Sequence, residues 1–203
     1  MITFIIIGVT VLVSYLSFQN RTMWSALLFD PYLIKEKQEH WRFVTHGFIH
    51  ADFQHLLFNM LTLYFFGRNI ERVFMSLFGN EWVYPIFYLS ALVVASAPDF
   101  WKHRNNYHYR SLGASGAVAA VLFTTILFDP WQVLMLNFII PVPAILFAVG
   151  YIWYSNYMNK KGNDNIGHNA HMYGALYGFL FPLVLKPSIL PYFLNQLLHP
   201  RFL

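Results

Sequence analysis

The sequence contains no cysteine and few charged residues. Without cysteine, the chain can form no disulfide, thiolate nucleophile or cysteine-ligated metal centre. Charged side chains make up 11% of the 203 residues, whereas a soluble domain carries about 25%. Hydrophobic residues make up 57%, which is more than so few charges can cover. The composition therefore excludes an ordinary water-soluble domain and indicates a membrane protein with several spans.

The charge that is present is weakly positive, with a formal net charge of +4. Basic residues do not gather in a stripe interleaved with exposed aromatics, so we expect no nucleic-acid partner. A modest positive charge suits an anionic bilayer surface, so we expect membrane lipid to be a partner. The first apolar stretch begins at Ile2 with no charged region or small-residue cleavage site, which predicts a first helix and not a removable signal peptide.

Six apolar segments predict the helices of a single domain over residues 1–203. A membrane helix needs about 20 mostly apolar residues, and most of the segments approach this length. No internal repeat, linker or low-complexity stretch divides the chain. We therefore expect an all-α membrane protein, a bundle of six transmembrane helices. The expected helices cover about 2–18, 55–78, 81–101, 115–128, 143–157 and 169–185.

The fourth segment, which begins at Ser115, is short for a full span. The loop before it would then dip below the membrane surface, where non-helical backbone is tolerated only beside protein or a wet cavity. Pro141 and Pro143 suit the start of the fifth helix, because proline lacks an N–H that the first turn leaves unpaired.

The loops divide between two faces of the predicted bundle. Residues 19–54 mix charge with apolar patches and predict a structured, partly membrane-embedded first loop. With six helices, the polar connections 102–110 and 159–167 lie on the same face as this loop. The other face receives short turns near Gly79 and Asp129.

Polar residues in or beside membrane helices are costly and therefore informative. Gly113–Gly116 opens the fourth helix around Ser115, and His171 is followed by Gly174 and Gly178 on the sixth. The glycine-serine motif alone is more typical of close helix packing, and a lone membrane histidine often only forms a hydrogen bond across a helix interface. Together they predict two bare surfaces that bring the serine within hydrogen-bond reach of the histidine. A serine needs such a base to become a nucleophile.

The third member of a Ser-His-Asp triad is missing from the pattern. No acid lies within a turn or two of His171 in its helix, and Asp164 lies in the preceding loop. Because a buried carboxylate is costly in a bilayer, we expect a two-residue dyad. His168 is an alternative base one turn earlier, but the glycine spacing favours His171 and leaves His168 as a polar contact at the loop end.

His55 and Asn59 lie four residues apart, on one face at the start of the second helix. An imidazole and an amide directed at a tetrahedral intermediate would form an oxyanion hole with backbone N–H groups at Ser115. The alternative is a polar helix start that satisfies loop carbonyls.

These motifs resemble those of rhomboid intramembrane serine proteases. The resemblance covers about residues 39–180 and depends on the combination of motifs in the right order. Residues 39–50 resemble the Trp-Arg first loop, 50–59 the histidine-asparagine motif, 67–71 the G-x-x-x-E motif, 113–116 the nucleophile motif and 170–178 the base motif.

The resemblance implies that Ser115 attacks and His171 relays the proton. It implies that Asn59 and His55 hold the oxyanion, with backbone N–H groups near Ala114 and Ser115. The substrates would be single-span membrane proteins whose helix unwinds near the active face and is cut beside a small residue. No metal or cofactor is expected.

The resemblance also assigns structural roles and a location. Trp41 and Arg42 would anchor the first loop at the lipid interface. The chain is expected to be a multi-pass protein of the plasma (inner) membrane of a bacterium. The remaining structural positions of the family motifs are Glu71, Gly113, Gly116, Gly174 and Gly178.

Two features depart from the family pattern. Some rhomboids place an aromatic residue four positions after the serine, beneath the base, but this chain has Ala119 there. His171 then leans on another ring or is held less rigidly. The active face also carries nine basic residues against four on the other. The positive-inside rule would place it in the cytoplasm, whereas the family usually directs it away.

Two other functions compete with a protease. One is a membrane metal centre, because imidazole is a common metal ligand. The other is a rhomboid-like pseudoprotease that binds membrane helices, although such proteins usually lack the serine or the histidine that this chain keeps. The candidate metal ligands are His46, His50, His55, His168 and His171.

Overall fold

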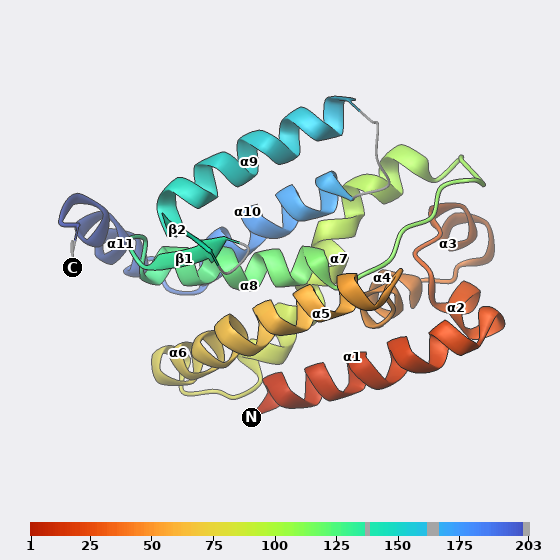
Figure 1. The fold of residues 1–203 in the computed structure, drawn as a ribbon, viewed down its shortest axis with the longest axis horizontal. Helices are drawn as coiled ribbons and strands as arrows, with labels where there is room; N and C mark the ends of the chain where they lie inside the picture. The colour runs from red at the N-terminus through yellow and green to blue at the C-terminus, as the bar shows by residue number, and fades with distance from the viewer. Residues whose placement is uncertain (137–138, 162–166, 201–203) are drawn as a thin grey trace.

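The structure is a computed structural model that describes residues 1–136, 139–161 and 167–200, apart from the side chain of Lys160. The described chain is mostly helical, as predicted, with one two-stranded sheet. Most of its long helices run roughly along the long axis of the molecule, and the helix Val83–His103 crosses them obliquely (Figure 1). The elements are α1 (Ile2–Gln19), α2 (Arg21–Leu27), α3 (Pro31–Lys37), α4 (Arg42–Thr45), η1 (His46–Phe48), α5 (Phe53–Thr62), η2 (Leu63–Gly67), α6 (Arg68–Phe78), α7 (Val83–His103), α8 (Ser115–Phe128), β1 (Val133–Leu136), β2 (Ile140–Pro143), α9 (Ala144–Lys161), α10 (His168–Leu185) and α11 (Ile189–Leu198).

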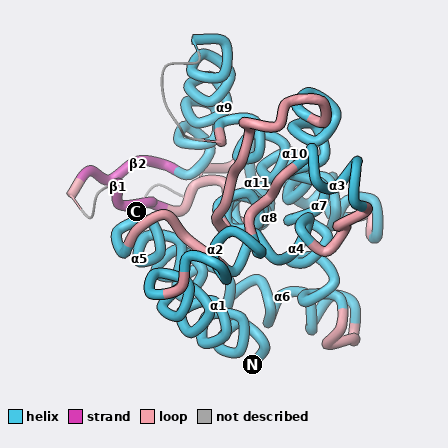
Figure 2. Tube along the Cα trace, turned by 90° about the vertical axis from the view of Figure 1, so that its right-hand side faces the viewer, coloured by secondary structure: helices cyan, strands magenta, loops and turns pink. Residues whose placement is uncertain are grey.

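Helix α8 forms the centre of the bundle. Of its 14 residues, 11 are buried, and it carries no charged side chain. A helix that is apolar on every side is stable only when other elements surround it. It contacts α5, α7, α9 and α10, and it lies among them in the end-on view of Figure 2. Ser115, its first residue, is thereby placed inside the bundle and not on its surface.

Helices α8 and α10 approach closely because glycines lie at their contacts. A methyl group on Gly174 would collide with the backbone carbonyl of Gly116, and one on Gly178 with that of Ala120. The Thr124 hydroxyl also donates across the interface to the Gly178 carbonyl at 2.7 Å. The close helix contact that the glycine spacing predicts is confirmed.

The first loop is structured, as predicted, and it is folded around Arg42. The Arg42 guanidinium donates to the Glu39 carboxylate at 2.6 Å and to the carbonyls of Ser25 and Leu28 at 3.1 and 2.8 Å. Arg42 is 5% exposed, whereas Trp41 is 54% exposed. The prediction that Arg42 anchors the loop at the lipid interface is therefore wrong, because a buried guanidinium needs the acceptors that converge on it inside the loop. The role of Trp41 as an anchor at the lipid interface stays a prediction.

Glu71 joins the second expected segment to the start of α1. Its carboxylate accepts hydrogen bonds from the N–H of Ile2 at 2.6 Å and from the N–H and hydroxyl of Thr3 at 3.0 and 2.6 Å. The first N–H groups of a helix have no intrahelical acceptor, and a carboxylate stabilises them. Gly67, one turn earlier, leaves room for the Thr3 side chain. The Gly-x-x-x-Glu motif thus holds α1 against α6.

The connection between α8 and α9 differs from the prediction. In place of a short turn near Asp129, the chain forms an antiparallel hairpin in which Pro141 pairs with Met135 and Pro143 with Val133. Helix α9 begins only at Ala144. The expected helix start near Pro143 is confirmed to within one residue, but Pro141 and Pro143 themselves lie in the hairpin and not in the helix. A two-stranded sheet consists of edge strands, which tolerate prolines whose missing N–H faces away from the partner.

Two of the described helices, α1 and α7, are long and apolar enough to cross a bilayer, with mean hydropathies of 2.0 and 1.4. Helices α8 and α11 are apolar but shorter, and α11 was not predicted. The second expected segment is helical throughout: α5 and α6 are joined without a gap by the π-helical turn η2. The count of six membrane spans remains a prediction.

Candidate active site

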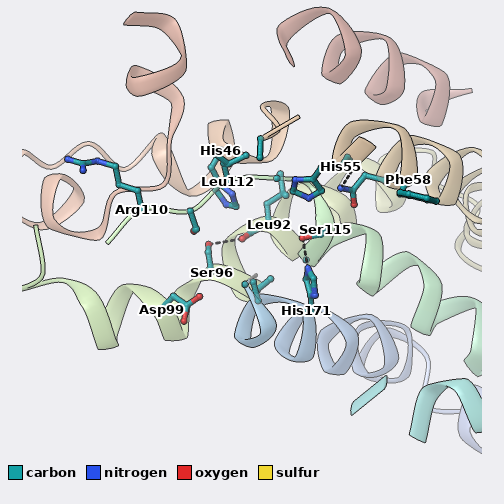
Figure 3. Close-up of a pocket in the computed structure, with 18 of the residues that line it drawn as sticks. His46, His55, Phe58, Leu92, Ser96, Asp99, Arg110, Leu112, Ser115 and His171 are labelled. Atoms are coloured by element: carbon teal, nitrogen blue, oxygen red, sulfur yellow. Dashed lines mark hydrogen bonds between the residues drawn. The ribbon is translucent and has the colours of Figure 1, made fainter. Parts of the chain in front are cut away.

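A cavity of about 830 Å³ opens where α5, α7, α8 and α10 meet the loop before α8. Ser115, His171, His55 and Asn59 all line it. Figure 3 shows Ser115 and His171 directed toward each other from α8 and α10, with His55 on the opposite side of the serine. The structure thus brings together four residues that lie on three separate helices.

Ser115 begins α8, and the two residues before it set its position. Gly113 has φ = +115°, a conformation that side chains rarely allow. A Cβ at this position would also lie 2.7 Å from the His55 ring. The Gly113 N–H donates to the His46 carbonyl at 2.9 Å, which ties this turn to the first loop. Glycine is therefore required for the backbone to pass beneath His55 and present the serine.

The side chains of Ser115 and His171 form a hydrogen bond. The Nε2 atom of His171 lies 2.7 Å from the Oγ atom of Ser115. A base must reach the hydroxyl proton at about 2.6–3.2 Å to accept it, and this pair meets that requirement. With Nε2 unprotonated, the imidazole can receive the proton of the serine hydroxyl.

A ring from α9 lies beside the base. The Tyr151 ring lies 6.2 Å from the His171 ring, with an interplanar angle of 27°. Phe123 and Phe147 pack against Tyr151 with ring centroids 5.6 and 5.4 Å away. Ala119, at the position where some rhomboids have an aromatic, is buried in α8. Of the two alternatives raised by this alanine, the structure favours a different ring beside the histidine. Sequence spacing could not find Tyr151, because it lies on another helix.

Asn59 and His55 face the cavity from α5. The N–H of His55 is capped by the Asp52 carboxylate at 2.7 Å, which fixes the start of this helix. The Asn59 amide donates one hydrogen bond to the His55 carbonyl at 3.0 Å. An amide nitrogen carries two N–H bonds, so a second donor remains for a ligand in the cavity.

The expected contribution of Ala114 to the oxyanion hole is not supported. Ala114 is completely buried, and its N–H points to the Nε2 atom of His50 at 3.5 Å. The Nδ1 atom of His50 lies 2.9 Å from the Ser14 hydroxyl, so this imidazole bridges α1 and the nucleophile turn. The N–H groups of Ser115 and Gly116 lie in the first turn of α8, where helix geometry provides no intrahelical acceptor.

Two buried histidines of the first loop stay neutral. Burial lowers the pKa of His46 to about 4 and that of His50 to about 3. Across the described ranges, no three histidine, aspartate or glutamate side chains converge as metal ligands do. His168 is buried and contacts the rings of Tyr154 and His171 at 5.8 and 6.2 Å. His168 is the first residue of α10, where the preceding loop ends, which agrees with its expected position.

Two acids bear on the expected dyad: Asp164, in the loop expected before His171, and Asp99, on α7. Asp164 lies outside the described residues. Asp99, on α7, is buried, lines the cavity and accepts a hydrogen bond from Asn169, two residues before His171. Sequence spacing along the histidine's own helix could not identify Asp99, because this acid approaches from a neighbouring helix.

A serine bonded to a histidine at the start of a helix, where the first backbone N–H groups lack intrahelical acceptors, is the arrangement of a serine hydrolase. Residues 37–188 match the family model described as the Rhomboid domain. The chain belongs to the rhomboid family, whose members are embedded in membranes.

Curated relatives agree with this membership. The chain is 36% identical over 142 residues to RHOMBOID-like protein 12, mitochondrial, of Arabidopsis thaliana, covering 65% of this chain and 42% of that protein. It is 25% identical to rhomboid protease GlpG of Haemophilus influenzae over 90% of both chains. It is 28% identical to the Bacillus subtilis protein named putative rhomboid protease YdcA, covering 70% of this chain and 65% of that protein. These names support the expected enzyme class, a serine endopeptidase.

Proposed function

We propose that the chain is an intramembrane serine endopeptidase that cleaves single-span membrane proteins near the membrane face. The observation that carries this proposal is the 2.7 Å hydrogen bond between Ser115 and His171 inside a helical bundle of the rhomboid family. The cavity around this pair supports it, because about 830 Å³ can admit an unwound peptide segment. No metal or cofactor is required for the reaction.

In the first step, the Ser115 Oγ attacks the scissile carbonyl carbon while His171 Nε2 takes the hydroxyl proton. The carbonyl oxygen becomes an oxyanion, which the Asn59 amide and the Ser115 N–H stabilise. The His55 ring lies over Gly113 and closes this side of the cavity. Such preorganised donors contribute about 2.7–4 kcal/mol each to transition-state stabilisation.

In the second step, the tetrahedral intermediate collapses and His171 gives its proton to the departing amine. The fragment with the new amino terminus leaves, and the fragment that carries the scissile carbonyl stays attached to Ser115 as an ester. Water then attacks the ester carbonyl and passes one proton to His171. As the ester bond breaks, Ser115 Oγ takes that proton from His171, and the second product leaves as a carboxylic acid that ionises in water.

The surrounding helices define where this chemistry takes place. We propose six membrane-spanning segments: α1, the continuous path α5–η2–α6, α7, α8, α9 and α10. Large hydrophobic side chains are exposed along α1 and α9, as lipid contact requires. The relatives include bacterial proteins and one named mitochondrial, so the inner membrane of a bacterium stays a prediction.

The test compares cleavage of a model single-span substrate by purified wild type and Ser115→Ala in detergent. A fluorophosphonate probe, which reacts with activated serines, gives a second measure that needs no known substrate. Ser76→Ala is the matched control, because Ser76 is exposed on α6 and does not line the cavity. Cleavage and labelling by wild type and Ser76→Ala, absent in Ser115→Ala, are expected. Equal activity in Ser115→Ala would overturn the assignment of the nucleophile.

A further inference from the structure

Asp99 is a buried acid beside the candidate active site. It lies near the end of α7, is 4% exposed and lines the same cavity as Ser115 and His171. In Figure 3 its carboxylate lies near α10, on the side of the cavity away from His55. A charged group in such a position is stable only when hydrogen bonds satisfy it.

Each carboxylate oxygen of Asp99 accepts a hydrogen bond from a different segment. Oδ1 accepts from the Asn169 side-chain amide at 2.8 Å, and Oδ2 accepts from the Tyr109 hydroxyl at 3.0 Å. Burial is the main reason that the pKa of the Tyr109 hydroxyl is raised, so this hydroxyl stays protonated and donates. The Asp99 carboxylate therefore connects α7 to α10, which carries Asn169, and to the loop before α8, which carries Tyr109.

The first of these segments carries the base. Asn169 lies in the first turn of α10, two residues before His171, and the N-cap Gly167 has no side chain to cap this helix. The first turn is therefore held from outside the helix, through the Asn169 side chain. A shift or rotation of this turn would move the His171 imidazole relative to Ser115, because both residues lie within the same turn of helix.

The second segment carries the nucleophile. Tyr109 stacks on His103 at the end of α7, with ring centroids 3.8 Å apart. Two residues later, Ser111 pairs with Phe29 of the first loop, and Gly113 then turns the chain into Ser115. Tyr109 thus fixes the start of the loop that presents the serine.

We propose that Asp99 is a positioning residue that holds the base and the nucleophile in register with each other. It acts indirectly, through its hydrogen bonds to Asn169 on the helix of His171 and to Tyr109 on the loop that leads to Ser115. This proposal rests on the proposed function. Asp99 is not itself a member of the dyad, because its carboxylate bonds to Asn169 and Tyr109.

The experiment measures the fluorophosphonate labelling rate of Ser115, together with kcat and KM for the model substrate. Asp99→Ala and Asn169→Ala are each expected to lower the labelling rate and kcat, because a misplacement of about 1 Å can cost on the order of 100-fold. KM should stay within about two-fold of the wild-type value. Tyr109→Phe removes only the second hydrogen bond and should give a smaller loss.

Two further variants separate positioning from simple stability. If the carboxylate acts through Asn169, the double variant Asp99→Ala with Asn169→Ala should be no slower than the slower single variant. Asp99→Asn combined with Asn169→Asp reverses the donor and the acceptor and should recover much of the rate. All rates are measured well below each variant's unfolding temperature. If Asp99→Ala does not fold, Asn169→Ala and the reversed pair provide the same test.

The outcomes distinguish this proposal from the proposed function. Wild-type rates in the Asn169 and Asp99 variants, with only a lower unfolding temperature, would show a structural role and overturn the positioning proposal alone. Fully additive losses in the double variant would also overturn it. A wild-type protein that the probe does not label would instead overturn the Ser115–His171 dyad itself.

Discussion

Gly174 of α10 lies directly against the backbone carbonyl of Gly116 in α8, one turn from the hydrogen bond between His171 and Ser115. No side chain fits between these two backbones. The separation of the two helices, and with it the distance from base to nucleophile, is therefore set by a contact between glycines.

Substitution of Gly174 by alanine should separate the helices and disrupt the dyad. Overpacking a tight contact costs about 1–3 kcal/mol, so we expect a lower unfolding temperature and a large loss of kcat. Gly150→Ala is the control, because a Cβ there meets nothing within 4 Å on α9. Thermal unfolding and cleavage assays in the same detergent check both. Wild-type activity in Gly174→Ala would show that the interface is not rigid.

Loss of the ring beside the base should lower the rate without affecting substrate binding. Tyr151→Ala removes an aromatic neighbour of His171, and such pairs contribute about 0.5–1.5 kcal/mol. If that energy positions the imidazole, kcat should fall by about 2- to 13-fold at constant KM. Tyr151→Phe keeps the ring and should keep the rate. If both variants lose activity equally, the hydroxyl and not the ring is responsible.

The amide of Asn59 should matter most in the transition state. If its second N–H stabilises the oxyanion, as proposed, Asn59→Ala should lower kcat by about 100- to 1000-fold with little change in KM. His55→Ala should cost less, because its ring mainly encloses the Gly113 turn. Asn156→Ala, an exposed substitution on α9, is the control. A rise in KM alone would assign Asn59 to substrate binding instead.

Stability should fall as the pH is lowered through the mildly acidic range. The pKa values of His46 and His50 are lowered from 6.5 to about 4 and about 3 in the folded protein, mainly by burial. Below pH 6.5 the unfolded state therefore binds protons that the folded state does not, and unfolding is favoured. The stabilisation is fully present above pH 6.5 and is lost progressively toward pH 4 and below.

Thermal unfolding in detergent between about pH 8 and pH 4.5 measures this dependence. His46→Phe should flatten the curve, since the position packs against Phe29 with ring centroids 5.3 Å apart. His40→Gln, at an exposed position, should leave the slope unchanged. An unchanged slope in His46→Phe would show that other groups control the acid transition.

Sequence reasoning located the elements that depend on local pattern. The helix from Ser115 to Phe128 has the predicted bounds, and the structured first loop and the close contact between the fourth and sixth segments are confirmed. It failed where a tertiary contact overrides a local preference. Pro141 and Pro143 were predicted to begin a helix, but both lie in β2, which pairs with β1. Arg42 read as a surface anchor, yet three acceptors surround it.

The sequence by itself determined that this is a membrane protein of the rhomboid family with a serine and a histidine on two glycine-faced helices. Charge scarcity, apolar length and the spacing of small residues are local properties, and they can be read along the chain. Only the tertiary structure decided that Tyr151 lies beside the base, that His50 engages the Ala114 N–H and that Asp99 joins the two halves of the site. Such contacts depend on how each helix is rotated and shifted against its neighbours, and packing of the whole bundle sets those quantities.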